Sequence, residues 1–396
     1  MKRILRSPIV TIGLAIFSML FGAGNLMYPL VVGMNSGCKS WIGMSAFLVT
    51  AVALPLLGLL TMLLFDGNYH EFFDRMGTRI GKLFIFASML IIGPGLVIPR
   101  IVTLSHVMMT PFIPWTFLAD VTPYSSLVFA LIFLGVTFLC TYKESKIVAL
   151  LGNVISPLLL ISLTIIIGKG LLSSSYCVSS SQTIGQVIIN NLILGYGTLD
   201  LLGAIFFSSM ILGLIKPLLN NQAQKGHAQR LRVGLLSGVL GTSILAAIYC
   251  GMAFLGAYFG HGLEGTNAGS LFREISLRVL GSHAALIIAV AVLMACLSTA
   301  IALVVVVAEY VQKTLFSDRI SYLSALVAVL LLSIPLSIFG LGYVLSLTGG
   351  SITYIGYPVL ICLTLCNLLY KTTGMNWVKL PVALTFGLAL ISYMWL

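Results

Sequence analysis

The chain has 396 residues, of which 59% are hydrophobic and only 8% are charged, and its mean hydropathy is +1.11. Soluble domains carry about 25% charged residues, so this composition excludes a water-soluble fold and indicates a polytopic membrane protein. The net charge is +11, but no basic segment is interleaved with aromatic residues that stack on bases, so we expect no nucleic acid as a partner.

Apolar stretches long enough to cross about 30 Å of hydrocarbon recur along the whole chain. They predict an all-α fold of about 11 transmembrane helices in a single membrane domain, residues 1–396. The stretches lie near residues 8–33, 41–65, 83–108, 124–142, 147–168, 191–215, 231–259, 284–308, 320–340, 341–369 and 376–395. The loops between them are too short for a soluble catalytic domain, so the function must reside in the membrane.

The distribution of basic residues predicts the orientation of the chain. If the first tail is cytoplasmic, only Lys39, Lys169, Arg273 and Arg278 lie in outer segments, and Arg100 lies within the third span. The rest of the 21 Lys and Arg residues then fall on the cytoplasmic side, as the positive-inside rule requires. We therefore expect a cytoplasmic amino terminus and, after an odd number of spans, an outer carboxyl terminus.

The first span is interrupted midway by glycines, because residues 21–25 read Phe-Gly-Ala-Gly-Asn. A broken helix leaves backbone groups unpaired, which a membrane tolerates only where they are buried in protein or line a polar cavity. Glycine lets a ligand approach the backbone closely, and the amino end of the second half-helix offers N–H groups and a positive dipole to a carboxylate. The alternative is close helix packing through small residues.

A charged residue, Arg100, lies inside the third span, after Gly93, Pro94, Gly95 and Pro99. A charge within the membrane is costly, so a functional role is the default interpretation. Its side chain could line a polar pathway or contact an acidic partner, but its long stem could also extend toward the outer surface. The sequence leaves both possibilities open.

The sixth span has a matching interruption at residues 195–200, which read Gly-Tyr-Gly-Thr-Leu-Asp. The first and sixth spans cross in opposite directions by the charge distribution, and matched breaks of opposite orientation are typical of inverted-repeat transporters. Asp200 lies about nine residues into the span, roughly 14 Å deep. We expect its carboxylate to pair with a substrate ammonium, to take up a coupling proton, or to cap the second half-helix.

The eighth span carries the hydroxyls of Ser298 and Thr299 near its middle, one turn after Ala295. Hard oxygen atoms of this kind are the ligands that an alkali cation needs. The alternative is that each hydroxyl bonds back to a carbonyl of the preceding helical turn.

The seven cysteines form no CxxC pair and have no neighbouring histidine at ligand spacing, so we expect no metal cluster. Cys362 and Cys366 share one helix face, which is also the spacing of packing residues. Cys38 and Cys177 both fall in predicted outer loops and could pair. The chain also lacks the HExxH and GxSxG motifs and paired carboxylates at mid-membrane depth, so we expect it not to be an enzyme.

The motif of residues 21–29, Phe-Gly-Ala-Gly-Asn-Leu-Met-Tyr-Pro, with the following Gly33, resembles the first-helix signature of a known family. This family is the bacterial branched-chain amino acid:cation symporters, the BrnQ-type Leu/Ile/Val carriers. The resemblance runs from about residue 8 to 370 and includes Gly93-Pro94, Pro99-Arg100, Gly195-Tyr196, Leu199-Asp200-Leu201-Leu202-Gly203-Ala204, Ala295-Cys296-Leu297 and Ala308-Glu309.

The resemblance implies the five-plus-five inverted repeat of the LeuT-type sodium symporters, in which helices 1 and 6 are broken. Repeat one would cover about residues 8–168, repeat two about 191–369, and an extra helix 376–395 would follow. The family usually shows twelve spans, whereas this chain shows an apparent eleven. The twelfth lies outside the repeat, so its loss need not abolish transport.

The resemblance also implies a division of roles among the residues at the breaks. Sodium would bind between carbonyls near Ser18 and Phe21 and the set Ala295, Ser298 and Thr299. The carboxylate of the substrate would meet the N–H groups of Ala23 and Gly24. The remaining expected substrate-binding residues are Gly22, Asn25, Gly197, Thr198 and Asp200.

These expectations combine into one functional hypothesis. The chain is expected to be a secondary active symporter of a bacterial cytoplasmic membrane that imports leucine, isoleucine, valine or methionine by alternating access. Its expected partners are the amino acid and the lipid bilayer, with Na⁺ or H⁺ as coupling ion and no resident cofactor. An amino-acid exchanger and a channel-like permease for another small solute remain alternatives.

Overall fold

The structure is a computed structural model that describes residues 8–395 apart from positions 114, 144–146, 174–176, 178–179, 219–225, 264–267, 282–284 and 351. Within these residues all the regular secondary structure is helical. Eight of its helices are long and apolar enough to cross a membrane, and three further apolar helices, Pro8–Leu20, Tyr322–Ile338 and Lys379–Met394, are shorter. Each of the predicted spans coincides with one or two of these helices, which confirms the all-α membrane fold.

The first five predicted spans contain the following helices, several of which are interrupted. They are α1 (Pro8–Leu20), α2 (Ala23–Ser36), α3 (Ser40–Leu48), α4 (Leu54–Leu64), α6 (Thr78–Ile92), α7 (Val97–Met109), α9 (Pro123–Thr141), α10 (Ile147–Leu150) and α11 (Ser156–Ser173). A π-helical turn, Val49–Ala53, joins α3 to α4, and another, Leu151–Ile155, joins α10 to α11. The shorter helices α5 (Tyr69–Asp74) and α8 (Thr116–Ala119) lie between spans.

The remaining predicted spans contain the following helices. They are α12 (Ile184–Tyr196), α13 (Asp200–Leu218), α14 (Gly226–Phe259), α16 (Ala285–Tyr310), α17 (Tyr322–Ile338), α18 (Leu341–Gly349), α19 (Tyr357–Thr373) and α20 (Lys379–Met394). A turn at Gly340 separates α17 from α18. Its φ of 86° lies in the left-handed region that favours glycine. The ninth and tenth predicted spans are therefore separate helices.

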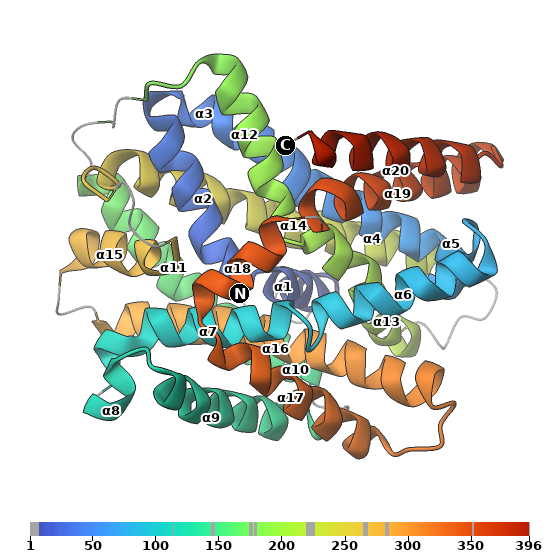
Figure 1. The fold of residues 1–396 in the computed structure, drawn as a ribbon, viewed down its shortest axis with the longest axis horizontal. Coiled ribbons are helices and arrows are strands. Elements are labelled where there is room, and N and C mark those ends of the chain that lie inside the picture. The colour runs from blue at the N-terminus through green and yellow to red at the C-terminus, as the bar shows by residue number, and fades with distance from the viewer. Residues whose placement is uncertain are drawn as a thin grey trace.

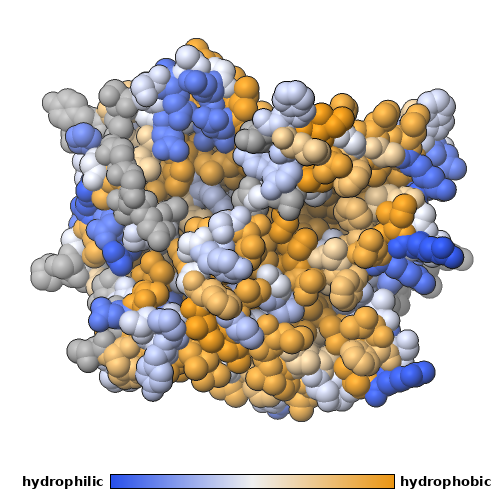
Figure 2. Space-filling model, in the orientation of Figure 1, coloured by the Kyte–Doolittle hydropathy of each residue, from blue (hydrophilic) through white to orange (hydrophobic). Residues whose placement is uncertain are grey.

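The surface is apolar in the middle and polar at two margins, as a bilayer requires. Most helices cross the view of Figure 1 from side to side, and Figure 2 shows a hydrophobic band between two margins where hydrophilic residues gather. At one margin Lys371 pairs with Glu71 at 3.0 Å, and Arg75 donates to the Asn376 side chain at 2.6 Å. These contacts attach α5 to the end of α19, among the basic residues that were predicted to be cytoplasmic.

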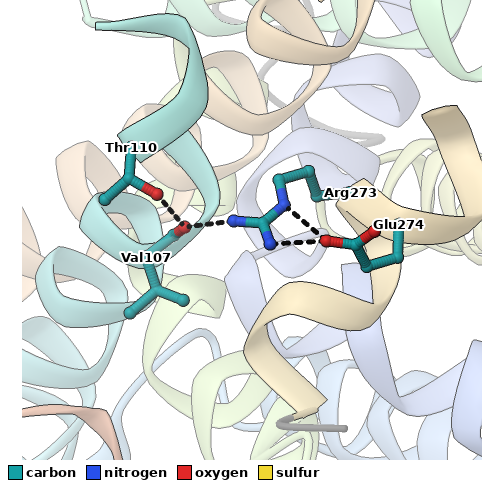
Figure 3. Close-up of polar contacts among 4 residues, drawn as sticks. All are labelled: Val107, Thr110, Arg273 and Glu274. Atoms are coloured by element: carbon teal, nitrogen blue, oxygen red, sulfur yellow. Dashed lines mark hydrogen bonds and ion pairs between the residues drawn. The ribbon is translucent and has the colours of Figure 1, made fainter. Parts of the chain in front are cut away.

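The opposite margin carries the residues that were predicted to lie outside. The loop expected at 260–283 contains the amphipathic helix α15 (Ala268–Leu280), which packs against α2, α7 and α11. Figure 3 shows how Arg273 of this helix holds Glu274 at 2.5 Å and donates to the Val107 carbonyl, at 3.5 Å, near the end of α7. The same carbonyl accepts a hydrogen bond from Thr110.

The broken helix α1–α2 occupies the centre of the molecule and packs along α14 (Figure 1). Glycines make this approach close: a Cβ on Gly33 would lie 1.8 Å from the Ala253 carbonyl oxygen, and one on Gly256 would lie 2.1 Å from the Leu30 carbonyl oxygen. Contacts of this kind are the means by which helices associate in lipid, where a hydrophobic driving force between them is absent. The packing fixes α2 while leaving its amino end at the centre.

Candidate functional site

The break in the first span lies where the glycines predict it. Gly22 is extended, with φ −106° and ψ −170°, and α2 begins at Ala23 without a side-chain cap. The first N–H groups of a helix have no carbonyl in a preceding turn, so those of Ala23 and Gly24 point into the break. The amino end of α2 can therefore receive an anion, as predicted.

The break in the sixth span separates Tyr196, the last residue of α12, from Asp200, the first residue of α13. Leu199 adopts a left-handed conformation with φ 62°, which costs a non-glycine residue about 1–2 kcal/mol. The Thr198 hydroxyl donates to the Gly195 carbonyl at 2.9 Å. The strain is held in place by burial, because Thr198, Leu199 and Asp200 are all inside the protein.

The two breaks face one another and their helices run in opposite directions. Asn191 of α12 donates to the Ser36 hydroxyl, at the end of α2, at 3.0 Å. Nearer the centre, a Cβ on Gly197 would lie 2.8 Å from the Tyr28 hydroxyl, so α2 and the second break are in contact there. The antiparallel arrangement that the charge distribution predicted is confirmed.

A buried polar cluster links the breaks through Asp200. The Asn25 amide donates to the Leu20 carbonyl at 2.8 Å, to Asp200 Oδ2 at 2.9 Å and to the Tyr249 hydroxyl. Tyr249, which belongs to α14, in turn donates to Asp200 Oδ2 at 3.2 Å. The carboxylate thus accepts hydrogen bonds from side chains of α2 and α14, and these contacts do not support capping of α13, one of the three roles left open for Asp200.

Arg100 lies between the two breaks and is only 2% exposed. Its Nη1 donates to the Gly197 carbonyl at 2.8 Å, and its guanidinium carbon lies 5.5 Å from the centre of the Tyr28 ring. A Cβ on Gly24 would be 2.1 Å from Nη2, so the guanidinium lies directly against the start of α2. The possibility that Arg100 extends to the outer surface is therefore excluded.

The location of Arg100 depends on a third interrupted span, whose helix break was not predicted from the sequence. The third predicted span consists of α6 and α7, separated by residues 93–96. Arg100 lies in the first turn of α7, and its N–H bonds to the Leu96 carbonyl. The glycines and prolines before Arg100 thus determine where its helix begins.

The two hydroxyls of α16, on Ser298 and Thr299, make different contacts. Thr299 donates to the Met19 carbonyl at 3.3 Å and would be 2.9 Å from a Cβ on Gly22, so it reaches the first break. Ser298 bonds back to the Ala295 carbonyl of its own helix at 3.0 Å, which is the alternative that the sequence left open. The Ser18 hydroxyl is buried and has no hydrogen-bond partner among the described residues. Oxygen atoms from α1 and α16 therefore adjoin at the break.

The structure places the predicted site residues at the two breaks, on α7 and on α16, and adds two tyrosines and one carbonyl to them. The α1 carbonyl that Thr299 contacts belongs to Met19, between the predicted Ser18 and Phe21. Tyr249 and Tyr28 were missed, although a buried tyrosine in an apolar span needs a partner for its hydroxyl. Every predicted residue is buried except Gly197, which is half-buried, so the site is closed to both faces.

Comparisons with known proteins agree with this geometry. Residues 6–394 match the family model described as branched-chain amino acid transport protein. The branched-chain amino acid permease BraB of Bacillus subtilis is 29% identical over 366 residues, covering 91% of this chain and 80% of the permease. A branched-chain amino acid carrier protein of Staphylococcus aureus is 28% identical over 402 residues, covering 96% of this chain and 87% of the carrier.

Solved structures show a related fold at low sequence identity. A manganese transporter of Eremococcus coleocola superposes with a TM-score of 0.64 at 15% identity, over 97% of this chain and 86% of the transporter. A Na⁺-coupled sialic acid symporter superposes with a TM-score of 0.51 at 12% identity, over 99% of this chain and 90% of the symporter. Both likenesses concern the overall fold.

The polar cluster predicts the effect of removing one hydroxyl. Tyr249→Phe leaves Asp200 Oδ2 with one donor fewer in a buried site, which should destabilise the protein by about 1–3 kcal/mol. The midpoint of thermal unfolding in detergent should fall, whereas Tyr258→Phe, on the same helix but outside the cluster, should leave it nearly unchanged. Equal midpoints for the two variants would show that the hydrogen bonds of Tyr249 contribute nothing.

Proposed function

Because the chain belongs to the family of branched-chain amino acid transport proteins, we propose that it imports leucine, isoleucine or valine, and also methionine, by symport with Na⁺. The observation that carries the proposal is the pair of antiparallel broken helices. Their backbone carbonyls accept hydrogen bonds from Arg100 and Thr299, and the Asn25 side chain of the first break donates to Asp200 of the second. The match to a transporter family agrees with the lack of enzyme motifs in the sequence.

The backbone and charges at the breaks suit the α-amino and α-carboxyl groups of an amino acid. The carboxylate would accept hydrogen bonds from the N–H groups of Ala23 and Gly24 and from Arg100, whose guanidinium lies against Gly24. The ammonium of the substrate would approach the carboxylate of Asp200. The hydrogen bonds that this carboxylate accepts from Asn25 and Tyr249 both go to Oδ2 rather than to Oδ1. The other residues that we propose to contact the substrate are Gly22, Asn25, Gly197 and Thr198.

The coupling ion would bind where α1 and α16 adjoin. The Met19 carbonyl, the Thr299 hydroxyl and the Ser18 hydroxyl, which has no hydrogen-bond partner among the described residues, would provide hard oxygen atoms for Na⁺. Phe21, Ala295 and Ser298 are the other residues that we propose for this site. An inward-moving charge gains about 2.3 kcal/mol per 100 mV of membrane potential, in addition to its concentration gradient. Protonation of Asp200 is the alternative means of coupling.

Burial of the site supports transport by alternating access. A substrate held between residues that are closed to both faces can exchange only after helices move, and a continuous pore would not need this arrangement. Ion binding at the first break would order the backbone that receives the substrate. Binding of the ion and of the amino acid should therefore be coupled, each raising the affinity for the other.

Uptake by the purified protein in liposomes tests the proposal directly. Labelled leucine, isoleucine, valine, methionine and alanine are offered with Na⁺ and proton gradients imposed separately, and counterflow is measured with unlabelled substrate inside. We expect saturable, Na⁺-dependent uptake of the first four, and counterflow. Uptake that needs internal amino acid would indicate an exchanger, and flux without counterflow would indicate a channel.

The ion site predicts unequal effects for the two hydroxyls of α16. Thr299→Ala removes the hydroxyl that reaches the first break, and the loss of one ligand worth about 1.4 kcal/mol should raise the Na⁺ concentration for half-maximal uptake about tenfold. Ser298→Ala should have a smaller effect, because Ser298 bonds within its own helix. Thr299→Ser should restore the wild-type value.

A matched control is Ser333→Ala, which removes a buried hydroxyl bonded within α17. It should leave the Na⁺ dependence unchanged. If Thr299→Ala also leaves it unchanged, the hydroxyl has only a structural role, and uptake that follows the proton gradient would then favour coupling through Asp200.

Recognition of the carboxylate by Arg100 predicts a change in selectivity. Leucinol, which carries a hydroxyl in place of the carboxylate, should inhibit leucine uptake by the wild type only weakly. Arg100→Gln should raise the leucine concentration for half-maximal uptake at least about tenfold, because a hydrogen bond to a charged group contributes about 1.5–3 kcal/mol. It should affect inhibition by leucinol much less.

Two variants control this experiment. Arg100→Lys keeps the charge but loses the forked donors, so its affinity for leucine should fall between those of the wild type and Arg100→Gln. Arg278→Gln removes an exposed guanidinium that binds loop carbonyls of Phe259 and His261, and it should behave as wild type. A parallel loss of leucine and leucinol binding in Arg100→Gln would contradict contact with the carboxylate.

A further inference from the structure

Two cysteines far apart in sequence meet at the margin that was predicted to lie outside. Cys38 belongs to the short turn Gly37–Lys39 between α2 and α3, and Cys177 lies in the segment between α11 and α12. Their thiols are within hydrogen-bond distance of each other. From the sequence, both were predicted to fall in outer loops, and their pairing was left open.

Other contacts hold the two segments together independently of the thiols. The Ser180 hydroxyl donates to the Asn35 carbonyl at 2.6 Å, and the Lys39 ammonium donates to the Gln182 carbonyl. Deeper in the fold, Asn191 donates to Ser36 at 3.0 Å. The approach of Cys38 to Cys177 therefore results from a built interface.

The chemical surroundings of the pair favour oxidation. Cys38 is exposed and Cys177 is half-buried, so reagents in water reach the first thiol directly. The pair lies at the end of the spans opposite to Arg75, Lys371 and Glu71, which occupy the margin rich in basic residues. Disulfides form and persist on the outer side of cell membranes and are rare in the cytosol.

We propose that Cys38 and Cys177 form an intramolecular disulfide that fastens the segment before α12 to the end of α2. The two broken helices would then be joined covalently at their outer ends, across 138 intervening positions of the sequence. This inference is independent of the transported substrate, because it concerns only the outer margin of the protein.

The reaction requires a disulfide as oxidant, supplied by a small disulfide or by an oxidised dithiol protein outside the cell. The Cys38 thiolate attacks one sulfur of the oxidant and releases the other as a thiol, which gives a mixed disulfide. The Cys177 thiolate then attacks Cys38 Sγ and displaces the second thiol. Two protein thiols lose two electrons, and one disulfide becomes two thiols that take up the two protons.

The protonation of Cys177 and the exposure of Cys38 explain the order of these steps. Burial and the hydrogen bond to Cys38 raise the pKa of Cys177 to about 12, so this thiol is protonated at neutral pH and reacts slowly with external reagents. Only the thiolate is nucleophilic, so the oxidation should accelerate as the pH rises above neutral. Exposed Cys38 is therefore the first site of exchange.

The chain offers a matched control pair. Cys362 and Cys366 also have their side chains within hydrogen-bond distance, but they are four residues apart on α19, inside a membrane-spanning segment. They share the closeness of the first pair without its access to water. Oxidation that depends only on the proximity of two thiols would link both pairs.

The test uses the full-length purified protein incubated with oxidised glutathione, followed by alkylation of the remaining thiols and peptide mapping without reduction. We expect a peptide pair linked through Cys38 and Cys177, with two fewer alkylated thiols per chain and a mass lower by two hydrogens. The link should persist in the double variant Cys362→Ser, Cys366→Ser and should be absent from Cys38→Ser and from Cys177→Ser.

A stability measurement provides a second readout. Oxidation should raise the midpoint of thermal unfolding of the wild type by about 2–4 °C or more and should have no effect on Cys38→Ser. The proposal is overturned if both cysteines remain alkylatable after oxidation of the folded protein. It is overturned equally if Cys38 links to another cysteine or to a second molecule, and wild-type mapping decides this even if a variant fails to fold.

Discussion

The structure depends on how the protein satisfies the backbone carbonyls that two broken helices leave inside a membrane. An unpaired carbonyl in hydrocarbon costs several kcal/mol, so each break needs donors from elsewhere in the fold. Three side chains supply them: Asn25 bonds to the Leu20 carbonyl, Thr299 to that of Met19, and Arg100 to that of Gly197. These donors belong to α2, α16 and α7, so the breaks are stable only when all these helices are assembled.

Two charged side chains, Arg100 and Asp200, are buried at the breaks of a chain in which only 8% of the residues are charged. A buried ion is costly unless it is paired or hydrogen-bonded. Arg100 contacts Gly197 and lies against Gly24, while Asp200 receives hydrogen bonds from Asn25 and Tyr249. Under the proposed function, the positive and negative groups would be complementary to a zwitterionic amino acid.

The sequence predicted the features that depend on residue type. Glycine breaks, the positive-inside bias and a charge at mid-membrane depth each have a local cause, so the antiparallel helices and the functional interest of Arg100 and Asp200 could be inferred. The partners could not, because contacts such as Tyr249 with Asp200 join spans whose packing has no signature in a single sequence. A backbone carbonyl is present in every residue, so Met19 could not be distinguished from the nearby Ser18 and Phe21.

The arrangement also explains why an ion and a substrate should affect one another across the first break. The carbonyl that Thr299 holds belongs to Met19, and the adjacent carbonyl, of Leu20, is held by Asn25, which also binds Asp200. A cation at the Met19 carbonyl would replace the hydrogen bond of Thr299 and fix the direction of this backbone. The next residue along the chain would then present its carbonyl to Asn25 in one orientation, and Asn25 would in turn fix the carboxylate of Asp200. Coupling would thus require a displacement of only one peptide unit, which is small enough to occur within a closed site.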